Sequence, residues 1–232
     1  LDVDFIATGG DDRTYASLVN NSAHIGLADP MFAMFENPEG IKGEIIGELV
    51  NRVPNVAVCI NPSIKIDSLQ DFAKYKIGTF QEFTTTNGIA RYFLPKETDI
   101  KPYDYKSLID KLIAREIDIA IVIPEQGIDL EALGGKIVFD FRDVTKHFLY
   151  SGFTIANILE KTYKQALKSF LVSTREATRF VLKNKEESYK TFVRLFPNLK
   201  EPKRIFDYYL NIWSSTIKVE KEDYAAARKM WN

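Results

Sequence analysis

The stretch Ser68–Leu94, SLQDFAKYKIGTFQEFTTTNGIARYFL, decides the fold class because helical and strand patterns alternate within it. We predict a short helix over Ser68–Tyr75, a strand over Lys76–Phe80, a polar loop over Gln81–Thr86 and a second helix over Asn87–Leu94. A loop that leads from the carboxyl end of a strand into a helix exposes unpaired backbone N–H groups at the positive end of the helix dipole. Open α/β sheets place ligands at such positions, so this loop is either a ligand site or an ordinary capped turn.

The composition is typical of a globular protein. The 232 residues are 45% hydrophobic and 27% charged, and 31 Lys and Arg residues nearly cancel 32 Asp and Glu residues. This balance excludes the basic surface that nucleic-acid binding requires. No apolar run approaches the roughly 20 residues that cross a bilayer. A single cysteine, Cys59, excludes an internal disulfide and a cysteine-based zinc cluster, and we expect no metal, cofactor or nucleic-acid partner.

The first residues, LDVDFIATGG, alternate apolar and polar side chains, which predicts a strand over Leu1–Thr8. This beginning has no initiating Met and neither the charged nor the apolar segment of a signal peptide. We expect that a leader and part of the mature chain have been removed, or that the chain is a domain of a larger protein.

An internal repeat links two parts of the chain. Leu18–Pro30 (LVNNSAHIGLADP) and Leu112–Pro124 (LIAREIDIAIVIP) share one register, in which a buried strand stops at a proline beside an acid, Asp29 or Glu125. A helix that feeds a parallel strand is half of a βαβ unit, so we predict two similar α/β lobes with ligand-facing loops. Coincidence between two generic α/β units is the alternative.

We expect Pro124–Gly127 to form a turn.

The two lobes define the predicted domain organisation. The first lobe comprises residues 1–54 and 148–232 and the second comprises residues 55–147, so two strands cross between the lobes as a hinge. From Glu160 onward, apolar residues recur at helical spacing, which predicts a long helix followed by three shorter ones. The predicted fold is thus a two-lobed α/β fold with a helical C-terminal segment. A cleft between lobes is a common place for a small-molecule site.

Six short motifs follow one another along the chain: Gly9-Gly10 after a strand, Ala23–Pro30 (AHIGLADP), Asn61–Ile64 (NPSI), Ser68–Phe80 (SLQDFAKYKIGTF), Asp118–Ile121 (DIAI) and the helical run Tyr163–Glu187. This series resembles the type 2 periplasmic solute-binding proteins of ABC importers. The group that it resembles binds alkanesulfonates, nitrate and thiamine pyrimidine precursors. The resemblance spans nearly the whole chain. Two departures are the absence of the family's first strand and helix ahead of Leu1, and Ala73-Lys74-Tyr75 in place of the usual Gly-Lys.

The resemblance implies a type 2 periplasmic-binding-protein-like fold that binds a small molecule between its lobes, closes over it and delivers it to an ABC permease in the membrane. It also implies a periplasmic or extracytoplasmic location, and we expect a monomer that is not an enzyme. The family pattern, carried over position by position, implies these ligand-binding residues: Gly10, Asp29, Pro30, Met31, Asn51, Phe80, Gln81, Thr84, Thr85 and Glu125. Turn formation or helix capping is the alternative role for each of them.

The side chains of these loops favour one class of ligand. They include three acids and three aromatic residues: Asp29, Glu82, Glu125, Phe32, Phe80 and Phe83. Buried carboxylates need hydrogen-bond donors, and aromatic faces stack on rings or attract cations. We therefore expect a neutral-to-cationic, ring-containing solute rather than nitrate or a sulfonate. Arg13, Arg52 and Arg91 are the opposing features. Arg91, one turn into the helix after the key loop, either reaches an anion or belongs to a solvated helix face.

Two other functions are left open. A ligand-sensing domain of a membrane receptor would use closure for signalling, and a transmembrane or signalling segment in the parent gene would reveal it. An enzyme of the thiamine-pyrimidine-synthase-like branch would convert its bound ligand. That branch carries a Cys-rich motif, whereas we expect Cys59 to be a small hydrophobe buried on a strand. His24 and His147 are isolated and lack metal-binding spacing.

Overall fold

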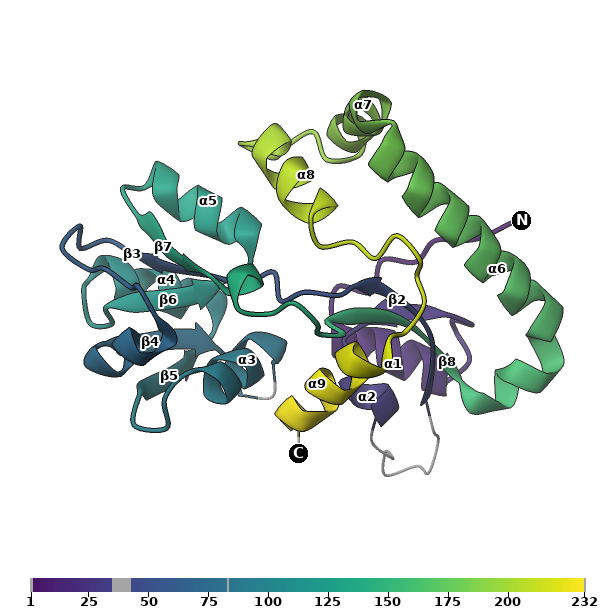
Figure 1. Ribbon diagram of the computed structural model, residues 1–232, viewed down its shortest axis with the longest axis horizontal. Coiled ribbons are helices and arrows are strands. Elements are labelled where there is room, and N and C mark those ends of the chain that lie inside the picture. Colours follow the sequence, from purple (N-terminus) through teal and green to yellow (C-terminus); the bar gives the residue numbers. More distant parts are fainter. Residues whose placement is uncertain (1, 35–42, 83, 232) are drawn as a thin grey trace. The chain divides into compact units, whose positions relative to one another are not determined.

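A computed structural model describes residues 2–34, 43–82 and 84–231 of the protein, except the side chains of residues 32 and 157–162 (Figure 1). Backbone contacts divide the chain into two compact units. The first comprises Leu1–Arg52, His147–Thr191 and Leu210–Asn232, and the second comprises Val53–Lys146 and Phe192–Tyr209.

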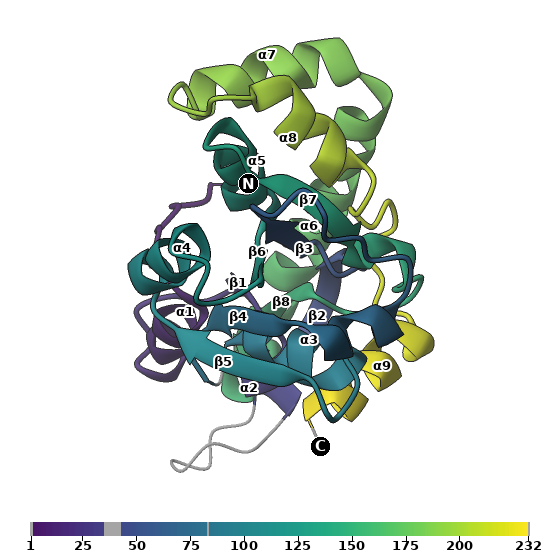
Figure 2. The same ribbon diagram turned by 90° about the vertical axis from the view of Figure 1, so that its left-hand side faces the viewer.

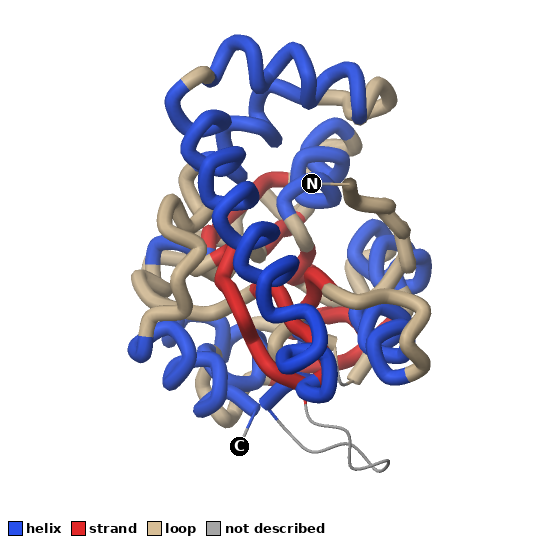
Figure 3. Tube along the Cα trace, turned by 90° about the vertical axis from the view of Figure 1, so that its right-hand side faces the viewer, coloured by secondary structure: helices blue, strands red, loops and turns tan. Residues whose placement is uncertain are grey.

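The first unit contains an antiparallel sheet, which has the order β1-β8-β2 among the described residues. Its elements are α1 (Asp11–Val19), β1 (Gly26–Ala28), α2 (Met31–Met34), β2 (Gly43–Val50), β8 (Ser151–Ala156), α6 (Asn157–Lys183) and α9 (Lys221–Trp231). The long helix α6 packs on β8 and β2, and Figure 3 shows it crossing the strands of this sheet. The repeat-based prediction of a parallel strand here is wrong, because β1 pairs antiparallel with β8.

The predicted first strand is also wrong for the residues that the structure describes. Residues 2–8 are irregular, and the side chain of Phe5 is 93% exposed. An alternating pattern makes a strand only where another strand offers hydrogen-bond partners, and these residues pair with no described strand.

The second unit contains a mixed sheet of order β5-β4-β6-β3-β7 in the described part of the chain. Its elements are β3 (Val56–Cys59), the 3-10 helix η1 (Leu69–Lys74), β4 (Lys76–Phe80), α3 (Thr85–Phe93), β5 (Asp99–Tyr103), α4 (Tyr105–Ile113), β6 (Ile119–Val122), α5 (Pro124–Ala132), β7 (Lys136–Asp140), the 3-10 turn η2 (Phe141–Asp143) and α8 (Pro202–Leu210). Strand β4 is parallel to β5 and β6, as a βαβ unit requires, while β3 is antiparallel to β6 and β7. Helices α3 and α4 pack on β4, and α5 packs on β3 and β7 (Figure 2).

The core of the second unit forms where apolar strands meet α4. Val58, Ala120, Leu108 and Leu112 are fully buried in one cluster. A Cβ atom at Gly78 would lie 2.5 Å from Cδ1 of Leu108, so the absence of a side chain there allows α4 to approach β4.

Two elements differ from the sequence-based expectation. Pro124–Gly127 begins α5 and is not a turn, because Pro124 occupies the first helical turn and Ile128 and Leu130 are buried behind it. Ser68–Tyr75 is a 3-10 helix over Leu69–Lys74, in which Oδ2 of Asp71 accepts the backbone N–H of Ser68 at 3.0 Å.

The C-terminal region is divided differently from the prediction. Residues 192–209, expected in the first lobe, lie with the second unit, so the chain passes between units at 52/53, 146/147, 191/192 and 209/210. Helix α7 (Lys185–Leu195) contains the third passage. Side chains of α8 and of the residues before it bond to the second unit, as in the ion pair of Arg204 with Glu131 and that of Lys200 with Asp129. No described helix is long and apolar enough to span a bilayer.

Candidate functional site

In the first unit, two of the predicted loops meet at Asp29. Gly10 is the N-cap of α1, and the next residue, Asp11, accepts a hydrogen bond from the backbone N–H of Asp29 to its Oδ1 at 3.3 Å. Oδ1 of Asp29 accepts the backbone N–H of Met31 at 2.8 Å. Asp29 is buried, and desolvation raises the pKa of Asp11. The structure therefore brings Gly10, Asp29, Pro30 and Met31 together around Asp11, an acid that the sequence analysis missed.

Asn51 occupies a structural position at the end of β2. Its backbone N–H donates to the carbonyl of Ile212 at 3.1 Å, and its carbonyl accepts the N–H of Phe148 at 3.2 Å. These bonds hold the chain just before the passage at 52/53.

In the second unit, the remaining predicted residues lie at one edge of the sheet. The strand register places five residues at this edge: Phe80, Tyr103, Val122, Val56 and Asp140. Because β4 and β6 are parallel, α3 and α5 both begin here, so the amino ends of both helices lie at the same edge. The loop after Phe80 and the start of α5 are therefore neighbours, as a shared ligand site would require.

Thr84 caps the start of α3. Its Oγ1 accepts the backbone N–H of Asn87 at 3.3 Å and donates to the carbonyl of Gln81 at 2.7 Å. Gln81 is exposed, and Thr85 is the first residue of the helix. The ring of Phe80 lies 6.1 Å from that of Tyr105. Thr84 thus has the capping role that was the alternative to ligand contact.

The charge of Arg91 is countered within the second unit. Its Nε donates to Oδ1 of Asn87 at 3.0 Å, and its guanidinium lies 3.7 Å from Glu82. The side chains of Arg91 and Glu82 are 52% and 60% exposed, as on a solvated helix face. Phe83, one of the predicted aromatic residues, and the side chain of Phe32 lie outside the described part of the chain.

Glu125, in the first turn of α5, is a half-satisfied carboxylate. The hydroxyl of Tyr209, on α8, donates to its Oε1 at 2.8 Å. Oε2 is buried and has no hydrogen-bond partner among the residues that the structure describes. A buried carboxylate oxygen without a donor is unfavourable, so this position is suited to receive an N–H or O–H group.

Asn55 is a second acceptor at this edge, directly ahead of β3. The side chain is fully buried, and its Nδ2 donates to Oγ1 of Thr86 at 3.1 Å and to the carbonyl of Val122 at 3.4 Å. Because a carbonyl only accepts, this contact fixes which side of the amide carries nitrogen. Oδ1 is then a buried acceptor without a partner in the described residues. A polar residue placed directly ahead of an apolar strand was the signal that could have identified Asn55.

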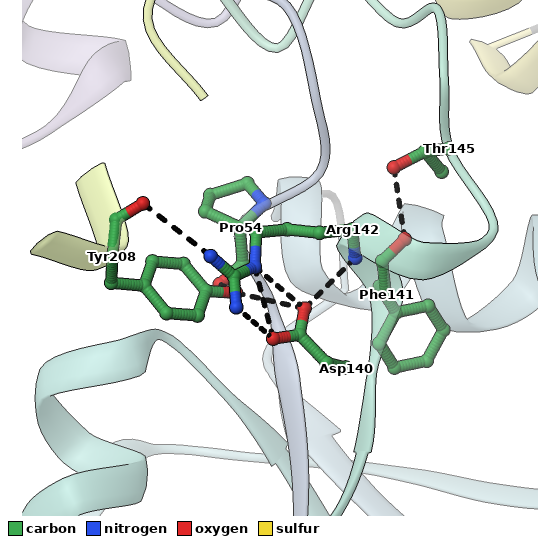
Figure 4. A network of polar contacts seen from close by, with 6 residues as sticks. All are labelled: Pro54, Asp140, Phe141, Arg142, Thr145 and Tyr208. Carbon is green, nitrogen blue, oxygen red and sulfur yellow. Dashed lines mark hydrogen bonds and ion pairs between the residues drawn. The ribbon is translucent and has the colours of Figure 1, made fainter. Parts of the chain in front are cut away.

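A polar network holds α8 to this end of the sheet (Figure 4). The guanidinium of Arg142 lies 2.6 Å from Oδ2 of Asp140 and 3.4 Å from the centre of the Tyr208 ring. The hydroxyl of Tyr208 lies 3.0 Å from both Oδ1 of Asp140 and the carbonyl of Pro54. Burial and the Asp140 carboxylate raise the pKa of Tyr208, which keeps its phenol neutral. The network therefore fixes the helix that presents Tyr209 to Glu125.

Metal and thiol chemistry have little support in the described residues. They contain no group of three or more His, Cys, Asp or Glu side chains that could hold a metal ion. Cys59 is fully buried on β3, as expected, and burial raises the pKa of its thiol, which opposes formation of the reactive thiolate.

Solved structures share the fold of this chain. The periplasmic aliphatic sulphonate binding protein SsuA from Escherichia coli matches with a TM-score of 0.76 and 13% identity, covering 95% of this chain and 77% of that chain. The alkanesulfonate-binding protein SsuA from Xanthomonas axonopodis pv. citri bound to MOPS matches with a TM-score of 0.66 and 11% identity, over 86% and 71% of the two chains. A Candida albicans gene product with the generic periplasmic binding protein structural fold matches with a TM-score of 0.66 and 9% identity, over 96% and 78%. The fold is therefore that of the periplasmic binding proteins, as predicted.

The family follows from a separate comparison. The model of the NMT1/THI5-like family matches residues 1–188. The protein belongs to the NMT1/THI5-like family. A search of curated proteins gave no match.

Proposed function

We propose that this protein is the solute-binding component of an ABC importer and that it captures a small, ring-containing, neutral-to-cationic molecule. Ligand binding favours a closed state because the ligand contacts the closed state better than the open one. In this role the protein is a monomer outside the cytoplasmic membrane and delivers its ligand, unchanged, to a permease.

Family membership and fold support the general role. The NMT1/THI5-like match covers most of the chain, and solved proteins of this fold include sulfonate-binding proteins and the ligand-binding component of an ABC-type import system from Staphylococcus aureus. Because fold alone does not define function, the ligand class has to be argued from the site.

Glu125 is the observation that carries the proposed ligand class. Tyr209 occupies Oε1, and Oε2 is a buried acceptor that no described residue satisfies. An amine, an amidine or a ring N–H would supply the missing donor, whereas a sulfonate or nitrate supplies only acceptors.

The surrounding charges favour the same class. The predicted ligand loops of the first unit carry two acids, Asp11 and Asp29. In the second unit, the guanidinium of Arg91 contacts Glu82 and Asn87. Carboxylates in these loops would repel an anion. Phe80 offers an aromatic surface for a flat ring at the end of β4.

Isothermal titration calorimetry with an aminopyrimidine and an alkanesulfonate of similar size tests the ligand class. We expect saturable binding of the aminopyrimidine, loss of that binding in Glu125→Ala, and no heat from the sulfonate. Tight binding of the sulfonate together with none of the aminopyrimidine would reject the proposed class. Recovery of a chemically altered product would reject a binding-only role.

A further inference from the structure

A pair of buried acids lies in the first unit, outside the loops of the proposed ligand site. Glu48 on β2 is 0% exposed and Asp223 in the first turn of α9 is 1% exposed. Neither carboxylate oxygen of Glu48 has a hydrogen-bond partner within the described part of the chain. Two ionised carboxylates enclosed together would repel each other, and each would lose its hydration.

Asp223 has the hydrogen-bond donor that Glu48 lacks. Nδ1 of His147 lies 2.9 Å from Oδ1 of Asp223, and the His147 side chain is 64% exposed. An ionised carboxylate only accepts hydrogen bonds, so His147 is the donor in this contact. Asp223 thus has a donor for its carboxylate whereas Glu48 has none, so the proton of the pair is best placed on Glu48.

Another acid that faces Glu48 is Glu220, which precedes α9 and whose carboxylate lies 3.4 Å from Nζ of Lys218. Burial, followed by the charge of Asp223, raises the pKa of Glu48 to about 8. The backbone of Glu220 lowers this pKa and its carboxylate raises it, so the shift toward the neutral form of Glu48 comes from burial and from Asp223 on α9.

Glu48 and His147, the partner of Asp223, lie near the two points at which the chain first enters and first leaves the second unit. Glu48 lies near the end of β2, ahead of the passage at 52/53, and His147 is the first residue after the passage at 146/147. The backbone N–H of Leu149 also donates to the carbonyl of Asp223 at 3.0 Å. The start of α9 is thus bound to the segment that returns from the second unit.

We propose that Glu48, beside Asp223, is a proton-binding site that keeps its proton in the folded protein, and that release of this proton destabilises the first unit. The ligand is the proton itself, and the device makes the structure of the first unit sensitive to pH. This inference does not depend on the proposed solute-binding function.

Infrared spectroscopy of the folded protein tests the protonation directly. We expect a carboxylic acid C=O band that persists at pH 6 in the wild-type protein and is lost in Glu48→Gln. Glu222→Gln is the matched control, because Glu222 is exposed in the same turn of α9 as Asp223. Absence of the band from the wild-type protein would overturn the proposal, as would a band that persists in Glu48→Gln. The wild-type result stands even if the variant does not fold.

Denaturant unfolding at several pH values tests the energetic consequence. The folded protein holds a proton that the unfolded chain releases above the ordinary pKa of 4.5, so the stability due to this proton is full below that value and is lost as the pH rises to about 8. Relative to Glu48→Gln, we expect the unfolding constant of the wild-type protein to rise up to tenfold per pH unit between these limits. Parallel pH profiles of the two proteins would contradict the proposal.

Discussion

The hydroxyl of Tyr209 donates a 2.8 Å hydrogen bond to Oε1 of Glu125, which joins α8 to the start of α5. This bond orients the carboxylate and leaves its second oxygen as the acceptor for another group. Helix α8 therefore supports the proposed ligand site, although it lies far along the chain from the strands that form the sheet edge.

Glu125→Ala is expected to abolish binding of a donor-bearing solute and to leave the melting temperature of the empty protein nearly unchanged. Loss of the bond to Tyr209 is offset by removal of a buried oxygen that has no donor in the described structure, so the free energy of unfolding should change by no more than about 1 kcal/mol. Calorimetric titration and thermal unfolding measure the two effects. Glu97→Gln, at an exposed position, is the control. Loss of the fold in Glu125→Ala would make Glu125 a structural residue.

Tyr209→Phe should weaken solute binding because the carboxylate of Glu125 loses the bond that orients it. We expect affinity to fall by about tenfold, the equivalent of one hydrogen bond of roughly 1.4 kcal/mol. Tyr208→Phe is the control that distinguishes orientation of the Glu125 carboxylate from attachment of α8 to the sheet. Tyr208 bonds to Pro54 and Asp140 and not to Glu125. A larger loss of affinity in Tyr208→Phe than in Tyr209→Phe would argue against the orienting role.

Thr84→Ala should lower the free energy of unfolding by about 1 kcal/mol, the usual cost of losing an N-cap. Thr84→Ser retains the hydroxyl and should restore this stability. Urea unfolding of the two variants measures the capping role, and titration with solute measures any direct contact. Equal stability of the Ala and Ser variants would show that the cap contributes little.

Asp140→Ala should be the most destabilising of these changes. It removes the carboxylate from a half-buried guanidinium, that of Arg142, and from the hydroxyl of Tyr208 (Figure 4). We expect the free energy of unfolding to fall by about 2–3 kcal/mol. Lys203→Ala breaks the exposed pair with Asp207 and should cost no more than about 0.5 kcal/mol. Similar small losses in both variants would contradict a stabilising role for the network.

Local pattern predicted the second unit well. Lys76–Phe80 is a strand as predicted, the apolar run at Ile119–Val122 is a central strand, and the capping residues before Asn87 do begin a helix. These features depend on side-chain periodicity and on helix caps, and both are determined by residues that are close together in the sequence. The start of α5 was missed because Pro124 followed by Gly127 is as typical of a turn as of a first helical turn.

Long-range bonds explain what the sequence analysis could not predict. No local pattern indicates that Tyr208 and Tyr209 belong with the second unit, since their partners Asp140 and Glu125 precede them by 68 and 84 residues. The acceptors Asn55 and Asp11 were missed for the same reason, because burial and pairing depend on which strands become neighbours. The helical periodicity of α8 was visible, but its attachment was not.

The most direct test of the account is native mass spectrometry of the protein purified without denaturation and then exposed to a small-molecule extract. We predict a one-to-one, non-covalent complex with an intact solute that carries N–H donors, and loss of this complex in Glu125→Ala. A wild-type protein that retains no solute from the extract would contradict the account. So would a sulfonate that is retained equally well by the wild-type protein and by the Glu125→Ala variant.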